Sequence, residues 1–227
     1  MTNNKLLWSK NQHIFQKLYN YRVMKKILIA SSNPGKIKEI KKGLEKLEKM
    51  GFEILTLNQI NTGKDEPEET GDTFQKNAFI KAKFYADLTQ LPSLSDDGGL
   101  IIPYLNNEPG VKSRRWLGYV ASDEELVKYT LLKLKGCQGA ERNAYLKVCL
   151  CFYDPKTKKA LYNSRKILGH IVERSKITPT KGYPYRAIFV VEKYNKLYDE
   201  LTTQEHSEIN HRLIALKKLT NKIVDLI

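Results

Sequence analysis

The sequence predicts a mixed α/β fold, and three observations support this. An apolar run at residues 27–30 leads directly into a helical pattern, two long central stretches alternate apolar with polar residues, and another helical pattern closes the chain. Apolar residues recurring every three to four positions are typical of amphipathic helices, whereas strict alternation is typical of strands. Neither a repeat nor a low-complexity segment interrupts these elements.

The first elements form a strand, a loop and a helix. Residues 27–30 predict a buried strand, and the helix that follows should bury one face, formed by Ile37, Ile40, Leu44, Leu47 and Met50. Asn33 is a natural cap for this helix. Pro34 fits the first turn, because that turn makes no use of the N–H group that proline lacks.

A second strand is expected over residues 52–57, followed by a loop dense in acidic side chains. The next helix should begin near Thr73 and bury Phe74, Ala78, Ala82 and Tyr85. Residues 91–95 are then expected to enter a tight turn at the Asp-Asp-Gly-Gly sequence of residues 96–99, before the apolar residues 100–102.

The second half of the chain predicts a helix over 123–134 and two half-buried strands over 144–153 and 160–173, with a turn signal at residues 153–155. A short strand follows at 188–191. Thr202 and Glu205 have the spacing of a capping box, so the last helix should begin there. Its inward face would carry Ile209, Leu213, Leu216, Leu219 and Ile223.

Composition is that of an ordinary globular protein: 227 residues, of which 41% are hydrophobic and 28% charged. We expect a single domain over residues 24–227, preceded by an N-terminal extension of unknown role at 1–23. No segment approaches the roughly 18–20 apolar residues of a membrane-spanning helix, so no membrane partner is expected. Cys137, Cys149 and Cys151 lack the spacing of a zinc site or a disulfide framework, which favours reduced thiols in a cytoplasm.

The formal net charge of +14 admits a nucleic-acid-binding module as one hypothesis. The lysines are scattered rather than clustered, however, which favours a solvated basic surface. Such a surface would also attract small polyanions.

Two features could carry chemistry. The loop at residues 31–36 would place backbone donors, a helix N-terminus and Lys36 around a phosphate, although it lacks the P-loop pattern and an ordinary capped helix would look the same. Two acidic pairs, Glu68 with Glu69 and Asp96 with Asp97, supply the oxygen ligands that Mg²⁺ prefers. Taken singly, these pairs are also compatible with a solvated loop and a hairpin turn.

Taken together and in order, five segments spread over residues 25–224 resemble the non-canonical purine nucleoside-triphosphate pyrophosphatases, the inosine triphosphatase or Ham1-like proteins. These segments are Ser-Asn-Pro-Gly-Lys at 32–36, Glu-Glu-Thr-Gly-Asp-Thr-Phe at 68–74 with Asn-Ala at 77–78 and Lys-Ala at 81–82, Ser-Asp-Asp-Gly-Gly-Leu at 95–100, Pro-Gly-Val at 109–111 with Ser-Arg-Arg at 113–115, and Asn-His-Arg at 210–212 with Ala-Leu at 215–216.

The resemblance implies an elongated central sheet with flanking helices, two lobes and a substrate cleft between them. It also implies Mg²⁺-dependent hydrolysis of ITP, dITP or XTP to the monophosphate and pyrophosphate, by attack of water on the α-phosphorus. A homodimer is a further implication.

Roles for individual residues follow from the same resemblance. Lys36, Ser32 and Asn33 would hold the phosphates, and Glu69 and Glu68 would bind Mg²⁺. Asp97 would bind the metal and act as general base, with Asp96 supporting it. His211 and Arg212 would contact the purine and favour a 6-oxo group over an amino group. The remaining candidate substrate contacts are Gly98, Arg115, Tyr183, Tyr185, Arg186 and His206.

The sequence departs from the family near the base. The usual Phe-Gly-Tyr-Asp-Pro element is represented by residues 181–186, where Tyr183 or Tyr185 could stack on a base and Arg186 could contact base or phosphate, but structural tyrosines fit equally well. Gly98 and Asn210 stand where serine is common, and His206 stands where lysine is usual. Base selection is therefore less well defined than reaction type, and a nucleotide-binding relative without turnover is a further alternative.

Overall fold

The fold is built on one mixed sheet. The computed structural model describes residues 25–60, 62, 66–175 and 177–226. Within these residues the sheet has eight strands in the order β2-β1-β3-β5-β6-β7-β8, with β4 paired to β3. The strands are β1 (Lys25–Ile29), β2 (Phe52–Thr56), β3 (Ser93–Ile102), β4 (Glu108–Pro109), β5 (Asn143–Asp154), β6 (Lys159–Ile171), β7 (Phe189–Val191) and β8 (Lys196–Leu197).

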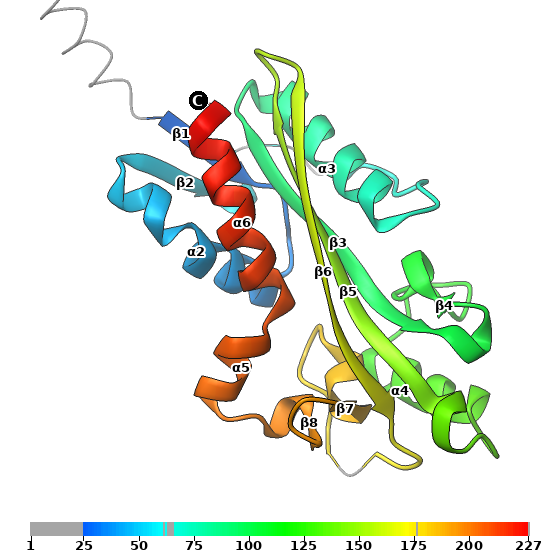
Figure 1. Ribbon diagram of the computed structural model, residues 1–227. Helices are drawn as coiled ribbons and strands as arrows, with labels where there is room; N and C mark the ends of the chain where they lie inside the picture. The colour runs from blue at the N-terminus through cyan, green and yellow to red at the C-terminus, as the bar shows by residue number, and fades with distance from the viewer. Residues whose placement is uncertain (1–24, 61, 63–65, 176, 227) are drawn as a thin grey trace, which may run out of the picture.

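Strand direction divides the sheet. β1 is parallel to β2 and to β3, whereas all pairings from β3 through β5 and β6 to β8 are antiparallel. Figure 1 shows β3, β5 and β6 running along much of the molecule. The predicted elongated mixed sheet is confirmed.

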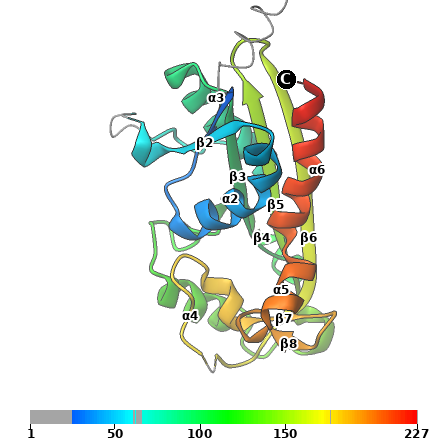
Figure 2. The same ribbon diagram turned by 90° about the vertical axis from the view of Figure 1, so that its left-hand side faces the viewer.

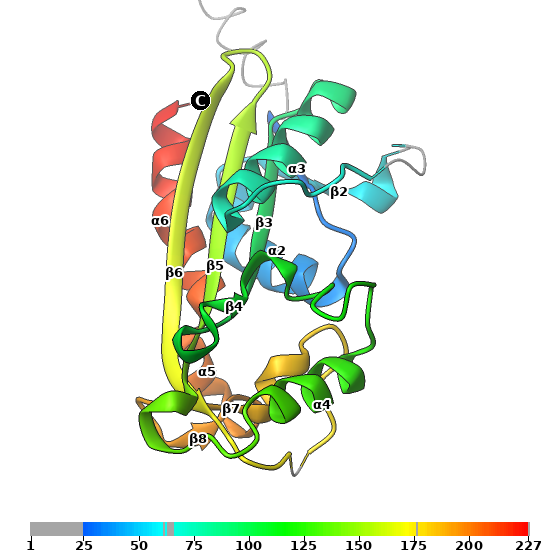
Figure 3. The ribbon, with the colours of Figure 1, turned by 90° about the vertical axis from the view of Figure 1, so that its right-hand side faces the viewer.

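Helices cover both faces of the long strands. They are α2 (Pro34–Lys49), α3 (Phe74–Thr89), α4 (Asp123–Lys133), α5 (Thr203–Ile209) and α6 (His211–Leu226), with short 3-10 helices η1 (Leu57–Gln59), η2 (Pro103–Leu105), η3 (Gly110–Lys112), η4 (Gly139–Arg142), η5 (Pro184–Ile188) and η6 (Tyr198–Glu200). Helices α2 and α6 pack together on one face, as Figure 2 shows, and α3 lies on the other, as Figure 3 shows.

The alternation along β5 accounts for this layering. Val148, Leu150 and Phe152 pack in one core cluster with residues of α2 and α6. Cys149 and Cys151 point to the opposite face, where Cys151 packs against alanines of α3. The prediction of a half-buried strand was therefore wrong for this part of β5, because helices cover both of its faces.

A second core cluster lies at the other end of the sheet. Leu100 and Ile102 of β3 pack there with Leu126 of α4, Ile188 of η5 and Tyr198 of η6. The two clusters give the molecule two lobes joined by the long strands, in agreement with the expected fold.

The predicted turn at residues 96–99 was wrong. β3 continues through this segment and pairs with β5 from Ser93 to Ile101. A Cβ atom on Gly98 would lie 3.0 Å from Val148 Cα and closer still to Lys147 O. The glycine therefore permits close approach of two strands, where the sequence suggested a reversal of the chain.

Two smaller corrections concern helices. The predicted last helix is two helices, α5 and α6, separated at Asn210, whose ψ of 103° is not helical. Leu216, Leu219 and Ile223 are buried as expected, whereas Ile209 and Leu213 are only partly buried. Met50 follows the last residue of α2 and is 49% exposed, so it does not belong to the buried face.

The remaining predictions concern helix caps, membrane-spanning helices and the N-terminal extension. The capping roles of Asn33 and Thr202 are confirmed. Within the described ranges, no helix has the length and hydropathy needed to cross a membrane. The expected N-terminal extension at 1–23 lies outside the described residues.

Candidate active site

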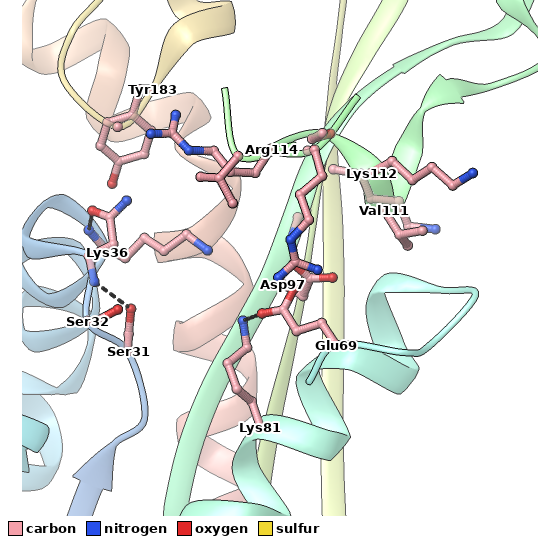
Figure 4. A pocket seen from close by; sticks show the side chains of 18 of the residues that line it. Ser31, Ser32, Lys36, Glu69, Lys81, Asp97, Val111, Lys112, Arg114 and Tyr183 are labelled. Atoms are coloured by element: carbon pink, nitrogen blue, oxygen red, sulfur yellow. Dashed lines mark hydrogen bonds and ion pairs between the residues drawn. The ribbon is translucent and has the colours of Figure 1, made fainter. Parts of the chain in front are cut away.

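A cavity of about 990 Å³ is lined by residues of both lobes. Its walls come from the β1–α2 loop, the loop before α3, the centre of β3, the segment around η3, the segment at 182–186 and the start of α6. Figure 4 shows side chains from these elements around one space. The segments that carry the predicted chemistry are thus brought together, although they are far apart in sequence.

The β1–α2 loop is organised by side-chain hydrogen bonds. Asn33 Oδ1 accepts from the backbone N–H groups of Gly35 at 2.9 Å and Lys36 at 3.2 Å, and Ser31 Oγ accepts from the N–H of Asn33 at 3.3 Å. Ser32, Asn33 and Lys36 line the cavity. The N-terminus of α2 and the Lys36 ammonium group therefore present positive charge to it.

Asp96 and Asp97 are neighbours on β3 with opposite surroundings. Asp96 is buried, and its Oδ2 lies 3.2 Å from Lys36 Nζ and 2.9 Å from an Arg212 nitrogen. Burial would raise the pKa of Asp96, but Lys36 and Arg212 outweigh it and hold that pKa well below its usual range. Asp96 is absent from the cavity lining and acts as an anchor for two cations.

Asp97 faces the cavity. Its Oδ1 accepts from the Gly98 N–H at 2.9 Å, while its buried Oδ2 has no hydrogen-bond partner among the described residues. Burial raises the pKa of Asp97 to about 6, against the opposing effect of Lys81 and Lys36. A carboxyl group with this pKa is suited to accept a proton near neutral pH.

Lys81 of α3 belongs to one of the family-like segments of the sequence, but it was not among the predicted site residues. Its Nζ donates to Glu69 Oε1 at 2.6 Å, as the dashed line in Figure 4 shows. Burial would lower the pKa of Lys81, but Asp97 and Glu69 raise it above its usual value. Lys81 lies one helical turn after the buried Asn77, and a polar pair at this spacing on a buried helix face was the signal available.

Four carboxylates line the cavity, and of these Glu66 and Asp72 are exposed, so Glu69 and Asp97 are the candidates to hold a metal ion. Both line the cavity, and Asp97 contributes the unpartnered Oδ2. No group of three or more histidine, cysteine or acidic side chains suited to a metal occurs in the described part of the chain. Two carboxylates are nevertheless compatible with Mg²⁺, which usually keeps several waters and binds substrate phosphates as well.

Three predicted site residues do not line the cavity: Asp96, described above, Glu68 and His206. Glu68 is exposed and does not line it, because successive side chains of the extended loop point in different directions and Glu69 takes the inward position. His206 is also outside the lining. Its Nε2 lies 3.2 Å from Tyr198 Oη and 3.4 Å from Asn210 Nδ2, so it packs behind the cavity wall.

His211 and Arg212 line the cavity at the start of α6. Arg212 is committed to Asp96 and to Glu39 of α2. His211 is buried with its Nδ1 unpartnered among the described residues, and burial together with the nearby Arg212 and Arg186 lowers its pKa to about 3. It is therefore neutral at physiological pH and keeps one free ring nitrogen.

The altered segment at 182–186 supplies the neighbouring wall. Tyr185 is buried and its hydroxyl donates to Ser113 O at 2.6 Å, which favours a structural role. Tyr183 lies against the β1–α2 loop, where a Cβ on Gly35 would be 2.5 Å from its ring. The guanidinium carbon of Arg186 lies 3.6 Å from the centre of the Tyr183 ring, and Arg186 donates to Glu39 at 2.9 Å.

The last two predicted contacts, Gly98 and Arg115, also line the cavity. The whole arrangement combines lysines, a helix N-terminus and four carboxylates, of which Glu69 and Asp97 are the least exposed. It can therefore bind a polyanion together with a divalent cation.

Comparisons with known proteins identify the family to which this chain is similar. The model of the Ham1 family matches residues 27–222. A dITP/XTP pyrophosphatase from Bacillus subtilis (strain 168) is 36% identical over 198 residues, which cover 87% of this chain and 96% of the relative. One from Legionella pneumophila (strain Lens) is 34% identical over 202 residues, covering 89% and 100%. The structure of a HAM1 protein from Coxiella burnetii superposes with a TM-score of 0.77 at 32% identity, covering 89% of this chain and 100% of that one.

Proposed function

This chain belongs to the Ham1 family, and from that premise we propose that it is a nucleoside-triphosphate pyrophosphatase. It hydrolyses non-canonical purine nucleoside triphosphates to the monophosphate and pyrophosphate, which removes them from the nucleotide pool. The substrates are the 6-oxopurine nucleotides ITP, dITP and XTP, in keeping with relatives that are named dITP/XTP pyrophosphatases.

One observation carries the proposal: Lys36, Lys81, Glu69 and Asp97, from four separate segments, line one cavity. Phosphoryl transfer needs positioning and charge neutralisation more than covalent help from the protein. In this reading Lys36 and the backbone at Ser32 and Asn33 bind the phosphates. Glu69 and Asp97 hold Mg²⁺, which when bound neutralises phosphate charge and polarises the phosphoryl oxygens.

Asp97 is the general base in the proposed mechanism. Its pKa of about 6 leaves it mostly ionised at neutral pH, so it can accept a proton from the attacking water. Lys36 is shared between Asp96 and the cavity, so Asp96 positions the lysine and does not itself contact substrate. Attack falls on the α-phosphorus, and pyrophosphate leaves.

Base selection is assigned to the wall formed by Tyr183, Arg186, His211 and Arg212. Tyr183 is the candidate for stacking, because the hydroxyl of Tyr185 is already bound to Ser113. The neutral His211 lines the cavity, and its buried Nδ1 has no partner among the described residues. A donor on this wall would favour a purine 6-oxo group, since an exocyclic amine would present another donor to it.

The proposal also covers the cellular compartment and the oligomeric state of the enzyme. Cys137, Cys149 and Cys151 are all unpaired, which supports a reducing compartment such as the cytoplasm. A homodimer is proposed on family resemblance, and light scattering of the purified protein tests it: a monomer mass would contradict it.

The decisive experiment incubates the purified protein with Mg²⁺ and, separately, ITP, dITP, XTP, GTP and ATP. We expect pyrophosphate and the monophosphate as products, with the 6-oxopurine nucleotides ITP and XTP preferred over ATP. Orthophosphate as the product would contradict the assigned reaction. Nucleotide binding without hydrolysis would favour the alternative of a nucleotide-binding relative.

A further inference from the structure

The cationic side chains that line the cavity fall into two groups. Five of them are paired with carboxylates: Lys36 with Asp96, Lys81 with Glu69, Arg114 with Asp123, Arg186 with Glu39, and Arg212 with Glu39 and Asp96. Lys112, Arg115 and Lys147 form no ion pair with any described residue. Lys112 and Arg115 are exposed, and Figure 4 shows Lys112 directed away from Asp97, whereas Lys147 is half-buried.

The sheet register places Lys147 beside the predicted base. Cys149 pairs with Asp97 and Lys147 pairs with Gly99 across β3 and β5. Because side chains alternate along a strand, Lys147 and Asp97 lie on the same face of the sheet. Lys147 contributes to the cavity lining. On this face the space over Gly99 is filled by the side chain of Ser113.

This position is on the opposite face from the base-selecting wall. Asp96 alternates with Asp97, and it is bound by Arg212 of α6 and by Lys36. Lys147 instead shares the α3 face, where Cys149 packs with Phe74 at the start of α3. In a triphosphate whose base lies at Tyr183 and His211, Lys36 and the backbone at Ser32 and Asn33 would hold the phosphates from the α2 side. Lys147 would then contact the outer phosphates from the α3 face.

We propose that Lys147 is a substrate-binding residue that contacts the pyrophosphate part of the bound triphosphate, an inference that rests on the proposed function. A lysine that is half-buried without a carboxylate partner loses hydration, and a phosphate oxygen would restore a charged hydrogen-bonding partner. The leaving pyrophosphate gains negative charge as the bond to the α-phosphorus breaks. An ammonium group at this position stabilises that charge.

Binding of inorganic pyrophosphate in Mg²⁺, measured by isothermal titration calorimetry, tests the proposal independently of turnover. Lys147→Gln should weaken binding about tenfold, because a hydrogen bond to a charged group is lost. Lys147→Arg should retain most of the affinity. Lys159→Gln is the matched control, since Lys159 is an exposed sheet lysine at the start of β6 and does not line the cavity.

Kinetics provide the second readout. Lys147→Gln should raise the KM for the preferred triphosphate and the inhibition constant of pyrophosphate together, with thermal unfolding close to that of the wild type. Wild-type affinity for pyrophosphate in Lys147→Gln, or no pyrophosphate binding by the wild type, would overturn the proposal. A wild-type protein that binds pyrophosphate but hydrolyses no triphosphate would instead contradict the proposed function, and the calorimetric comparison would still decide the role of Lys147.

Discussion

Asp96 and Asp97 are adjacent aspartates whose surroundings give them different chemistry. Asp96 is fixed by Lys36 and Arg212, whereas Asp97 faces the cavity with one unpartnered oxygen. Asp97→Asn should therefore reduce turnover by about a hundredfold or more, since it removes the general base. Pyrophosphate release measures this effect, and unchanged turnover would refute the assignment. Asp87→Asn, an exposed substitution in α3, is the control.

The same substitution should not destabilise the fold. The folded-state pKa of Asp97 is raised from 3.8 to about 6, so ionisation of Asp97 above pH 6 costs folding free energy. Asparagine removes this charge, and the free energy of unfolding at pH 7 should stay equal or rise by up to about 3 kcal/mol. Urea unfolding measures the change. A clear loss of stability would indicate a structural role for the carboxylate.

The pH dependence of catalysis follows from the same group. The proposed base must be deprotonated, so kcat/KM should fall about tenfold per pH unit below a midpoint of at most about 6, because Mg²⁺ bound at Asp97 would lower its pKa further. Initial rates at saturating Mg²⁺ between pH 4.5 and 8 measure this dependence. An acidic limb that keeps the same midpoint in the residual activity of Asp97→Asn would exclude Asp97 as the titrating base.

How far the sequence predicts the site depends on the residue. Asp97, Glu69 and Lys36 could be named because the order of their motifs resembles the family, whereas each local pattern alone is equally compatible with a solvated loop, a turn or a capped helix. Lys81 was not assigned to the site: its spacing from Asn77 was the one local signal, and its contact is with Glu69, twelve positions earlier in the chain. Glu68 was predicted beside Glu69, but it is exposed and outside the cavity lining, and the sequence alone does not indicate which of two adjacent glutamates points inward.

At the scale of elements, the break between α5 and α6 has a specific cause. Asn210 Oδ1 accepts from the Leu213 N–H at 3.0 Å, and Asn210 Nδ2 donates to Glu39 at 3.1 Å. The residue therefore caps α6 and ties it to α2. It also sets the start of the helix that presents His211 and Arg212 to the cavity.

Asn210→Ala should accordingly lower the free energy of unfolding by about 1–2 kcal/mol, because the cap is lost. Asn210→Ser should restore part of this loss, since serine can also cap a helix. Asn221→Ala is the control: Asn221 lies on the exposed side of α6 and makes only a surface contact with Lys46. Equal stability of the Asn210→Ala and Asn221→Ala proteins in urea would contradict the capping role.

The elements that were predicted less well from the sequence depend on contacts with residues far away along the chain. The helical period runs through residues 203–226, so nothing local marks the break at Asn210 apart from the asparagine itself. The sequence at 96–99 is typical of a tight turn, yet it lies in β3 because β5, some fifty residues later, pairs with all of it. By contrast, α2 and α3 were predicted well because their caps and apolar faces are local.

At the scale of the whole molecule, Glu39 connects three parts of the chain. From α2 it accepts hydrogen bonds from Arg186 of η5, from Arg212 of α6 and from Asn210 before α6. Burial alone would raise the pKa of Glu39, but Arg212 and Arg186 outweigh it and lower that pKa to about 2. The carboxylate thus links the N-terminal lobe to the base-selecting wall across one side of the cavity.

Removing the charge of Glu39 should lower the stability of the fold, because the largely buried Arg186 and Arg212 lose the carboxylate that they share. Glu39→Gln is expected to lower the free energy of unfolding at pH 7 by about 3 kcal/mol. Glu53→Gln, which breaks an exposed pair with Lys26, should lower the free energy of unfolding by less than about 1 kcal/mol.

The sign of the pH dependence is fixed by the lowered pKa of Glu39. Its stabilisation of the fold is complete above the ordinary pKa of 4.5 and is lost as the pH falls toward 2. The stability difference between wild type and Glu39→Gln, measured by urea unfolding, should therefore narrow between pH 5 and pH 2. A difference that stays constant over this range would show that packing of the side chain, and not its charge, joins the two lobes.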